Sequence, residues 1–451
     1  MSKSISGFSK LSKRGKLRWL VENFFKDPEN VMRELKSYWL SNEEEQKILD
    51  GFSENTVSNF YLPFGVAPNF VINDKTYAIP MVIEESSVVA AASSAAKFWM
   101  TRGGFKAKVI STKKVGQVHF TWKGDANKLE AIADALKKQM RADAAEITKN
   151  MEARGGGVED IQLINYTGIE KNYYQLKVNF ETCDSMGANF INSVLECFAD
   201  SLRNFLAVQK NFTDEEKEVT IIMSILSNYT PECLVRAWVE CPIEDLGTFS
   251  NGMDATTFAD KFRTAVRIAH IDQYRATTHN KGIFNGIDAV VLATGNDFRA
   301  IEAGGHTYAA RDGHYRSLSH CKVEGGIFKF WLDIPLAVGT VGGLTKLHPI
   351  AKRSLEMLGS PDANELMTII ATTGLAQNFA ALRSLVTTGI QQGHMKMHLG
   401  NILNHMEATS KEKEAACKHF EDKVVSFNAV RVYLDTLRVK KTSVNTPLLK
   451  N

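Results

Sequence analysis

The sequence has few cysteines, no long apolar run and almost no net charge. Its 6 cysteines are scattered over 451 residues without a Cys-x-x-Cys pair. This argues against a zinc ribbon or a disulfide scaffold and fits a reducing cytosol. No apolar run approaches the ~18 residues of a membrane-spanning helix. Because 54 basic residues face 51 acidic residues, the net charge is +3, which excludes a strongly basic nucleic-acid binder and an acidic disordered chain.

Several motifs of known chemistry are also missing. No Gly-x-Gly-x-x-Gly follows a predicted strand and no Walker A sequence occurs, so any nucleotide must bind by other means. There is no Gly-x-Ser-x-Gly elbow for serine hydrolysis. His394 and His398 have the spacing of a helical zinc pair, but Met395 stands where the glutamate of His-Glu-x-x-His would be. We therefore predict no metal site.

The N-terminus allows two interpretations. Its first residues are basic and contain no acid, as in a transit peptide. Residues 16–25, however, predict the start of a helix that belongs to the mature protein. We expect an untargeted, cytoplasmic protein.

The apolar pattern predicts a large mixed domain over residues 1–109 and 229–388. Helices are expected within residues 1–60. Residues 86–99 are rich in Ala and Ser and nearly uncharged, which predicts a central helix packed closely on its neighbours. The apolar residues 289–293 predict a short strand buried on both faces. Two separate helices are expected at 364–372 and 377–388.

Residues 110–228 predict a self-contained unit of strand, helix, strand, strand, helix and strand, the ferredoxin-like arrangement. This fold hosts many functions. From 389 to 451 the chain is charged and helical, which predicts a small helical flap joined at Gly389 and Gly393. The fold class is therefore a multidomain mixture of α/β and α+β. In the small unit, strands are expected at 117–123, 160–166, 173–181 and 219–226, and helices at 126–153 and 189–208.

Reactive polar residues flank the predicted small-residue helix and the predicted buried strand. Glu84 and Glu85 precede the helix, where a carboxylate would feel both the helix N-terminus and burial; an ordinary first-turn glutamate is the alternative. Lys281 precedes the strand and Asp297 follows it, so we expect them to meet at one end of a sheet. A lysine held in this way can stabilise a developing oxyanion, although a structural salt bridge is an equal alternative.

Two further clusters are expected at the edges of helices. His394 lies at the root of the C-terminal part, where a histidine on a closing flap can donate a proton; a helix-surface histidine is the alternative. Residues 184–189 join a strand to a helix, and their small side chains would let a phosphate approach backbone N–H groups. A plain helix start is the alternative there.

Together these stretches resemble the hydroxymethylglutaryl-CoA (HMG-CoA) reductase family, in its soluble bacterial class II. The resemblance implies reduction of the HMG-CoA thioester through mevaldehyde to mevalonate and CoA, with two hydrides from a nicotinamide cofactor. It implies a cofactor site on the ferredoxin-like domain. It also implies a homodimer whose active site lies between two subunits, with a higher oligomer allowed. The matching stretches are residues 62–70, 80–93, 184–189, 278–297, 339–343 and 375–398.

The same resemblance implies roles for individual residues. Lys281 would stabilise the thioester oxygen, and Asp297 would hold and tune Lys281. His394 would protonate the departing CoA thiolate, and Glu85 would donate a proton in the aldehyde step or tune Lys281. The implied substrate contacts are Ser87, Arg275, Asn285 and Gln377, and the implied cofactor contacts are Asp184, Met186, Gly187, Asn189 and Asn228.

The expected cofactor is NADPH, with NADH possible. Members of the family that use NADH carry an acidic residue shortly before the glycine triplet, where it would repel a 2′-phosphate. Thr148, followed by Lys149, stands at the matching position, although Glu146 is close. The same enzyme run catabolically, as an NAD-dependent mevalonate oxidoreductase, is the near alternative. A non-catalytic ligand-binding protein is the alternative from another class.

Overall fold

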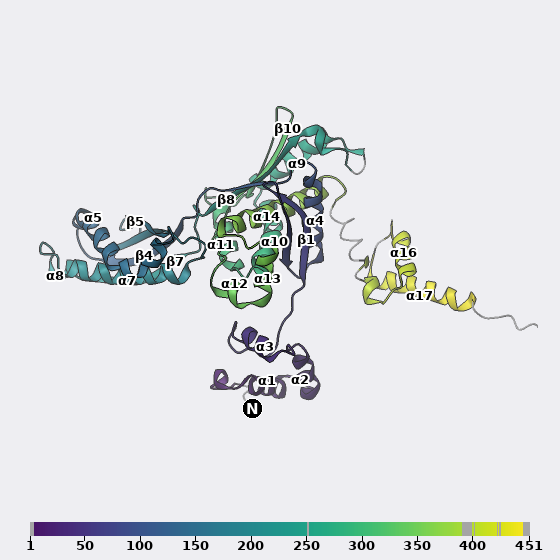
Figure 1. The fold of residues 1–451 in the computed structure, drawn as a ribbon, viewed down its shortest axis with the longest axis horizontal. Coiled ribbons are helices and arrows are strands. Elements are labelled where there is room, and N and C mark those ends of the chain that lie inside the picture. Colours follow the sequence, from purple (N-terminus) through teal and green to yellow (C-terminus); the bar gives the residue numbers. More distant parts are fainter. Residues whose placement is uncertain are drawn as a thin grey trace, which may run out of the picture.

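The structure, a computed structural model, describes residues 4–249, 252–389, 399–400, 402–421, 423 and 425–444 of the chain. It has the mixed multidomain class of fold that the sequence predicts, with helices and three separate sheets among these residues (Figure 1). Buried apolar side chains gather in three clusters, in a large mixed part, a small sheet unit and the C-terminal helices. None of the described helices combines the length and the apolar character of a membrane span.

The chain begins with three short helices, as expected for residues 1–60. Each starts at a residue whose side chain accepts a hydrogen bond from the first turn, which satisfies an N–H group that the helix leaves without a partner. The three helices are α1 (Lys13–Phe24), α2 (Pro28–Ser37) and α3 (Glu43–Asp50).

An antiparallel pair of strands follows, and the first of them has no clear signal in the sequence. β1 (Phe64–Ile72) pairs with β2 (Lys75–Val82). Proline and glycine between residues 63 and 68 are typical of a loop. Pro68, however, lies at an irregularity of the register between Ala67 and Phe70. A strand tolerates proline there because no ladder hydrogen bond needs its missing N–H.

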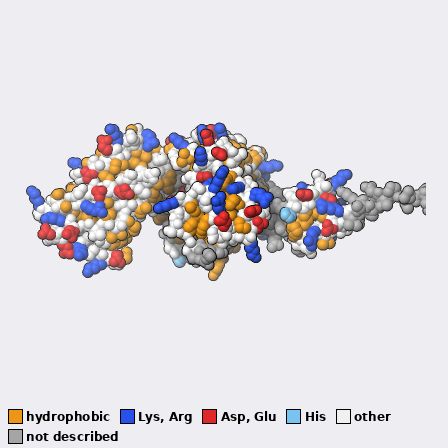
Figure 2. Space-filling model, turned by 90° about the horizontal axis from the view of Figure 1, so that it is seen from below, with side chains coloured by type: hydrophobic (Ala, Val, Ile, Leu, Met, Phe, Trp, Pro, Cys, Tyr) orange, Lys and Arg blue, Asp and Glu red, His pale blue; other side chains and the backbone are white. Residues whose placement is uncertain are grey.

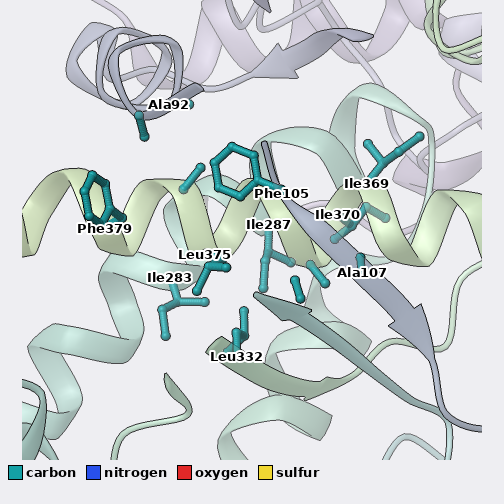
Figure 3. Close-up of a cluster of buried hydrophobic side chains, with 14 of the residues drawn as sticks. Ala92, Phe105, Ala107, Ile283, Ile287, Leu332, Ile369, Ile370, Leu375 and Phe379 are labelled. Carbon is teal, nitrogen blue, oxygen red and sulfur yellow. The ribbon is translucent and has the colours of Figure 1, made fainter. Parts of the chain in front are cut away.

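The large part packs helices on a four-stranded antiparallel sheet of order β3-β8-β10-β9. The predicted small-residue helix is α4, which packs against β1 and α14. Figure 3 shows Ala92, Ile287 and Phe379 in this core. The elements are α4 (Ser86–Met100), β3 (Lys106–Val109), β8 (Leu234–Pro242), α9 (Ala255–Ile271), α10 (Gln273–Ala293), α11 (Phe298–Ala309), β9 (Ser319–Glu324), β10 (Ile327–Pro335), α12 (Gly343–Leu347), α13 (Pro349–Met357) and α14 (Ala363–Val386).

Two predictions for this part were wrong. Residues 289–293 are not a strand but the last turns of α10. A short apolar run fits a buried strand and a buried helix equally, and α10 is enclosed by α14, α9 and β2. Residues 364–372 and 377–388 belong to one helix, α14. Its Gly374 does not end the helix but lets α10 approach, since a Cβ there would lie 2.7 Å from Ile287 Cγ1.

The small unit has the ferredoxin-like order that the sequence predicts. Its sheet is antiparallel with the order β5-β6-β4-β7, and its helices supply the apolar faces that cover it. The single long helix expected at 126–153 is divided at Ala144 into two. The elements are β4 (Lys114–Trp122), α5 (Ala126–Asp143), α6 (Ala145–Glu152), β5 (Gly157–Asn165), β6 (Tyr173–Glu181), α7 (Ala188–Ala207), α8 (Asp214–Lys217) and β7 (Val219–Ser227).

The C-terminal part is helical, as expected. α16 (Ser410–His419) starts in a capping box formed by Thr409 and Glu412, and it packs with α17 (Phe427–Val444) through a small apolar cluster. The expected joint at Gly393 lies outside the described residues. Figure 2 shows basic and acidic side chains interspersed over the large part and the small unit on the face seen from below, in keeping with the net charge of +3.

Gly286→Ala should destabilise the protein by about 1–3 kcal/mol. A Cβ at Gly286 of α10 would lie 2.8 Å from the Thr373 carbonyl oxygen and 2.9 Å from Gln377 Cβ on α14, so the two helices must move apart. Gly282→Ala on the same helix is the matched control, because its Cβ meets nothing within 4 Å. That variant should be neutral or gain up to about 1 kcal/mol from helix propensity. Urea unfolding measures both, and equal losses would contradict the packing described here.

Candidate active site

Helix α10 presents a polar stripe on its uncovered face. Tyr274, Thr278, Lys281, Asn285 and Asp288 follow one another at spacings of three or four residues, which places them on one side of a helix. The other sides of α10 are buried against the core. This stripe brings an ammonium, an amide and a carboxyl group into one row, and it is the natural starting point for an active site.

The start of α4 lies beside this stripe. Glu85 is the N-cap residue of α4, and its Oε2 is 3.9 Å from Lys281 Nζ, with the two side chains 40% and 65% exposed. The hydroxyl of Ser87, in the first turn of α4, donates a hydrogen bond to Glu85 Oε1. The structure therefore brings together three of the predicted site residues. An exposed ion pair of this kind contributes little to stability. Its effect is therefore to position the ammonium of Lys281.

Two more predicted residues carry polar groups that the described part of the chain leaves without a partner. Arg275 lies six residues before Lys281 on α10, and burial lowers the pKa of its guanidinium. Gln377 of α14 is buried, and its Oε1 accepts no hydrogen bond. Beside them, Gly282 has open space above its Cα. α10 thus holds a guanidinium, and α14 a buried amide oxygen, that are both available for hydrogen bonding.

Asp297 is not where the sequence predicts it. It is the N-cap of α11, accepts hydrogen bonds from the N–H groups of Arg299 and Ala300 at 3.0 and 3.3 Å, and pairs with the Arg299 guanidinium at 3.1 Å. Burial alone would raise the pKa of Asp297, but the hydrogen bonds from Arg299 and Ala300 outweigh it and lower the pKa.

The expected meeting of Lys281 and Asp297 at the end of a sheet is therefore wrong for a single chain. The segment between them is helix α10, and its last residue, Ala293, lies twelve residues beyond Lys281, roughly 18 Å along the helix axis. Asp297 follows at the far end of that helix.

The predicted cofactor residues gather on the turn before α7. Gly187, with φ +88, is the N-cap of α7, and no side chain caps this helix. The Asp184 carbonyl and carboxylate accept hydrogen bonds, both of 2.9 Å, from the N–H groups of Thr340 and Ala363 in the large part. Met186 and Asn228 line one small cavity of about 20 Å³, and Asn189 is exposed in the first turn of α7.

The position of Thr148 does not suit the role assigned to it. Thr148 lies on α6, is only 3% exposed, and donates its hydroxyl hydrogen bond to the Ala145 carbonyl at 3.3 Å. It faces the interior of the small unit rather than a ribose. Its neighbours Lys149 and Glu146 are exposed and 4.0 Å apart, so the sequence argument from Thr148 does not decide between NADPH and NADH.

His394 and His398 lie outside the described residues, so the structure does not place them. The structure also adds a residue that the sequence analysis overlooked. Asp288 lies seven residues after Lys281, two helical turns along the same face. Burial, the charge of Glu302 on α11 and a hydrogen bond with Glu302 raise the pKa of Asp288 to about 8, and its buried Oδ1 has no partner. Its i+7 spacing from Lys281 is the signal that could have found it.

Comparison with known proteins identifies the molecule as an oxidoreductase. It belongs to one family in particular: the model of the hydroxymethylglutaryl-coenzyme A reductase family matches residues 18–399, and the chain is a member of that family. A 3-hydroxy-3-methylglutaryl-coenzyme A reductase from Archaeoglobus fulgidus is 37% identical over 413 residues, covering 91% of this chain and 89% of the relative. A probable reductase of the same name from Borreliella burgdorferi is 31% identical over 404 residues, 89% of this chain and 88% of the relative.

A solved structure supports the same assignment. The class II reductase from Streptococcus pneumoniae, described as bound to NADPH in open conformations, is 36% identical with a TM-score of 0.68. The match covers 92% of this chain and 100% of that one. The family and class suggested by the sequence motifs are thereby confirmed.

Asp288→Asn should reduce the pH dependence of stability between about pH 5 and 8. Folding raises the pKa of Asp288 to about 8, above its value of about 4 in an unfolded chain. The folded state then keeps a proton that the unfolded state has lost, so this group's contribution to the free energy of unfolding falls as the pH rises through that window. Asparagine does not titrate. The free energy of unfolding of the variant, relative to that of the wild type, should therefore rise by about 1 kcal/mol or more between pH 5 and pH 8.

Urea unfolding at the two pH values measures this difference. Asp134→Asn is the matched control, because the Asp134 side chain is fully exposed. If Asp288→Asn differs from the wild type by the same amount at both pH values, the carboxyl group of Asp288 does not keep its proton in the folded state.

Proposed function

We propose that the chain reduces the thioester of HMG-CoA through mevaldehyde to mevalonate and CoA, with NADPH as the cofactor. The observation that carries this proposal is the ammonium of Lys281, which Glu85 holds at 3.9 Å beside the open surface over Gly282. Membership of the reductase family and the NADPH of the Streptococcus pneumoniae structure support it. The reverse, catabolic direction has no observation in its favour.

Lys281 is the group that stabilises the oxygen of the thioester and later of the aldehyde. A cation placed where negative charge develops stabilises the transition state more than the ground state, an effect worth roughly 10²–10⁴ in rate. Glu85 orients this ammonium, and its carboxyl group can deliver a proton to the oxygen in the second reduction. Bound NADPH would supply the hydride in each of the two steps.

The remaining groups of the site suit the other parts of the substrate. The guanidinium of Arg275, without a protein partner, suits the carboxylate of the hydroxymethylglutaryl group. Gln377 and Asn285 can hydrogen-bond its polar atoms, and Ser87 fixes Glu85. His394, at the base of the C-terminal part, is assigned the protonation of the CoA thiolate.

The turn before α7 suits a dinucleotide. The free N–H groups at the start of a 20-residue helix with no side-chain cap favour the negative charge of phosphate. Gly187 allows this turn to form, because its φ is positive and a Cβ there would lie only 2.5 Å from Thr182 Cγ2. Asp184, Met186, Gly187, Asn189 and Asn228 are the residues assigned to hold the cofactor.

We assign the complete active site to a homodimer. Because Asp297 lies beyond the far end of α10, which extends roughly 18 Å past Lys281, the partner subunit's Asp297 is the one that can approach the lysine. Ile271 at the end of α9 and Tyr274 at the start of α10, 66% and 89% exposed, supply apolar surface beside the site for such contact.

The domain organisation and location belong to the same proposal. We assign residues 1–109 and 229–388 to a large domain, 110–228 to a small domain and 389–451 to a C-terminal flap. Three separate apolar clusters support this division, and that of the large domain begins at Ala67. A cytoplasmic location is in keeping with six free cysteines.

The reaction itself is tested with purified protein, HMG-CoA and NADPH. We expect two NADPH oxidised for each mevalonate formed, and Lys281→Met should lower kcat by about 10² or more. Lys329→Met, which alters an exposed lysine paired with Glu240 on the large sheet, should leave the rate unchanged. No NADPH oxidation by the wild type would refute the function, and a preference for NADH above about tenfold (~1.4 kcal/mol) would refute the cofactor.

The shared site is tested by mixing two inactive variants. Lys281→Met and Asp297→Asn subunits, unfolded and refolded together, should form heterodimers with one intact lysine–aspartate site. The mixture should recover about a quarter of the wild-type activity, whereas either variant refolded alone should stay inactive. Absence of recovery, with heterodimers shown by mass spectrometry of tagged subunits, would place both groups of each site in one chain.

A further inference from the structure

Lys114 is a lysine in an inward-facing strand position. It begins β4, and Gly116 and Val118, which follow on the same face, are buried in the small unit. The whole residue is only 4% exposed. Lysine is seldom buried so deeply, because removing an ammonium from water is costly unless an opposite charge pairs with it.

No such charge pairs with Lys114 within the described ranges of the chain. Its Nζ donates to Thr182 Oγ1 at 2.6 Å and to the Ser185 carbonyl oxygen at 3.5 Å, both neutral acceptors. The neighbouring acid, Glu181, accepts hydrogen bonds from the Cys183 N–H at 2.7 Å and from the Thr112 hydroxyl. The structure thus buries a positive charge among uncharged oxygen atoms.

Both acceptors belong to the turn that leads into α7, the turn assigned above to the cofactor. The ammonium of Lys114 contacts this turn from the buried side. Helix α7, which has no acidic residue in its first turn, begins where the turn ends. Lys114 also lines the small cavity that Met186 and Asn228 share. A full positive charge and a helix dipole therefore act on the same turn, which also carries the Asp184 carboxylate.

The shape of the turn does not by itself require this charge. The large part already fastens it through the hydrogen bonds of Thr340 and Ala363 to Asp184. The Thr182 hydroxyl also spans it, donating to the Ser185 carbonyl at 2.7 Å. A neutral side chain at position 114 could satisfy the same oxygen atoms, so the charge has another use.

We propose that Lys114 is a positioning residue for the dinucleotide cofactor, whose buried charge offsets the negative charge of phosphates bound at the start of α7. The inference rests on the proposed function. It names a residue outside the set of cofactor contacts, and it acts through Thr182 and Ser185 rather than by touching the cofactor.

The test compares charge with hydrogen bonding at position 114. Lys114→Gln keeps a donor and loses the charge, Lys114→Met loses both, and Lys114→Arg keeps the charge. NADPH binding is measured without turnover by fluorescence titration of the full-length protein, and kcat and both KM values are measured separately. Lys113→Met is the matched control, because the neighbouring Lys113 is exposed and paired with Glu159 at 3.4 Å.

Lys114→Gln and Lys114→Met should weaken NADPH binding about tenfold or more, with the KM for HMG-CoA within about twofold of the wild type. Lys114→Arg should lie closer to the wild type, and Lys113→Met should match it. Unchanged NADPH binding in Lys114→Gln overturns the inference, even if Lys114→Met fails to fold. The inference is also overturned if NADPH binding, kcat and both KM values worsen equally and Tm falls, because Lys114 would then have only a structural role. A wild type that binds NADPH but does not reduce HMG-CoA would instead refute the proposed function.

Discussion

The close contact between α10 and α14 is the constraint on which the candidate site depends. Gly286 and Gly374 carry no side chain where the two helices meet, and a Cβ at either position would lie within 3 Å of the facing helix. Two long helices held this closely leave one stripe of α10 uncovered. That stripe carries Lys281 and Asn285, and the contact sets Gln377 against its edge.

The site and its surroundings leave several ionisable groups without an opposite charge. Among the described residues no carboxylate pairs with Arg275 or Lys114, and Asp288 lies beside a second carboxyl group, Glu302. Such arrangements do not stabilise a fold, because desolvation exceeds what neutral partners return. The two cations, Arg275 and Lys114, become favourable when an anionic substrate or cofactor pairs with them, which is how a binding site differs from a core.

Particular elements show how far the sequence could be interpreted. The ferredoxin-like unit was predictable, because its strands and helices alternate with clear periods and its turns contain glycine. The strand β1 was hidden by Pro68, which a register irregularity accommodates. Residues 289–293 were wrongly predicted to form a strand, because five consecutive apolar residues show no periodicity. Only the elements that pack on several sides of α10 show that these residues are helical. Thr148 was judged by its place in the chain, whereas the side chain points inward.

The candidate site, too, could be predicted from the sequence only in part. The sequence by itself determined the family, the residue types and their order along the chain, because glycine-rich turns, a glutamate pair and an isolated lysine are local features. Only the tertiary structure decided that Glu85 rather than Asp297 of the same chain accompanies Lys281, that Asp297 stands beyond the opposite end of α10, and that Lys114 is buried against the turn of residues 182–187. These depend on which elements pack together, and a side chain's partner across a core is set by helix length and strand register, which no local pattern encodes.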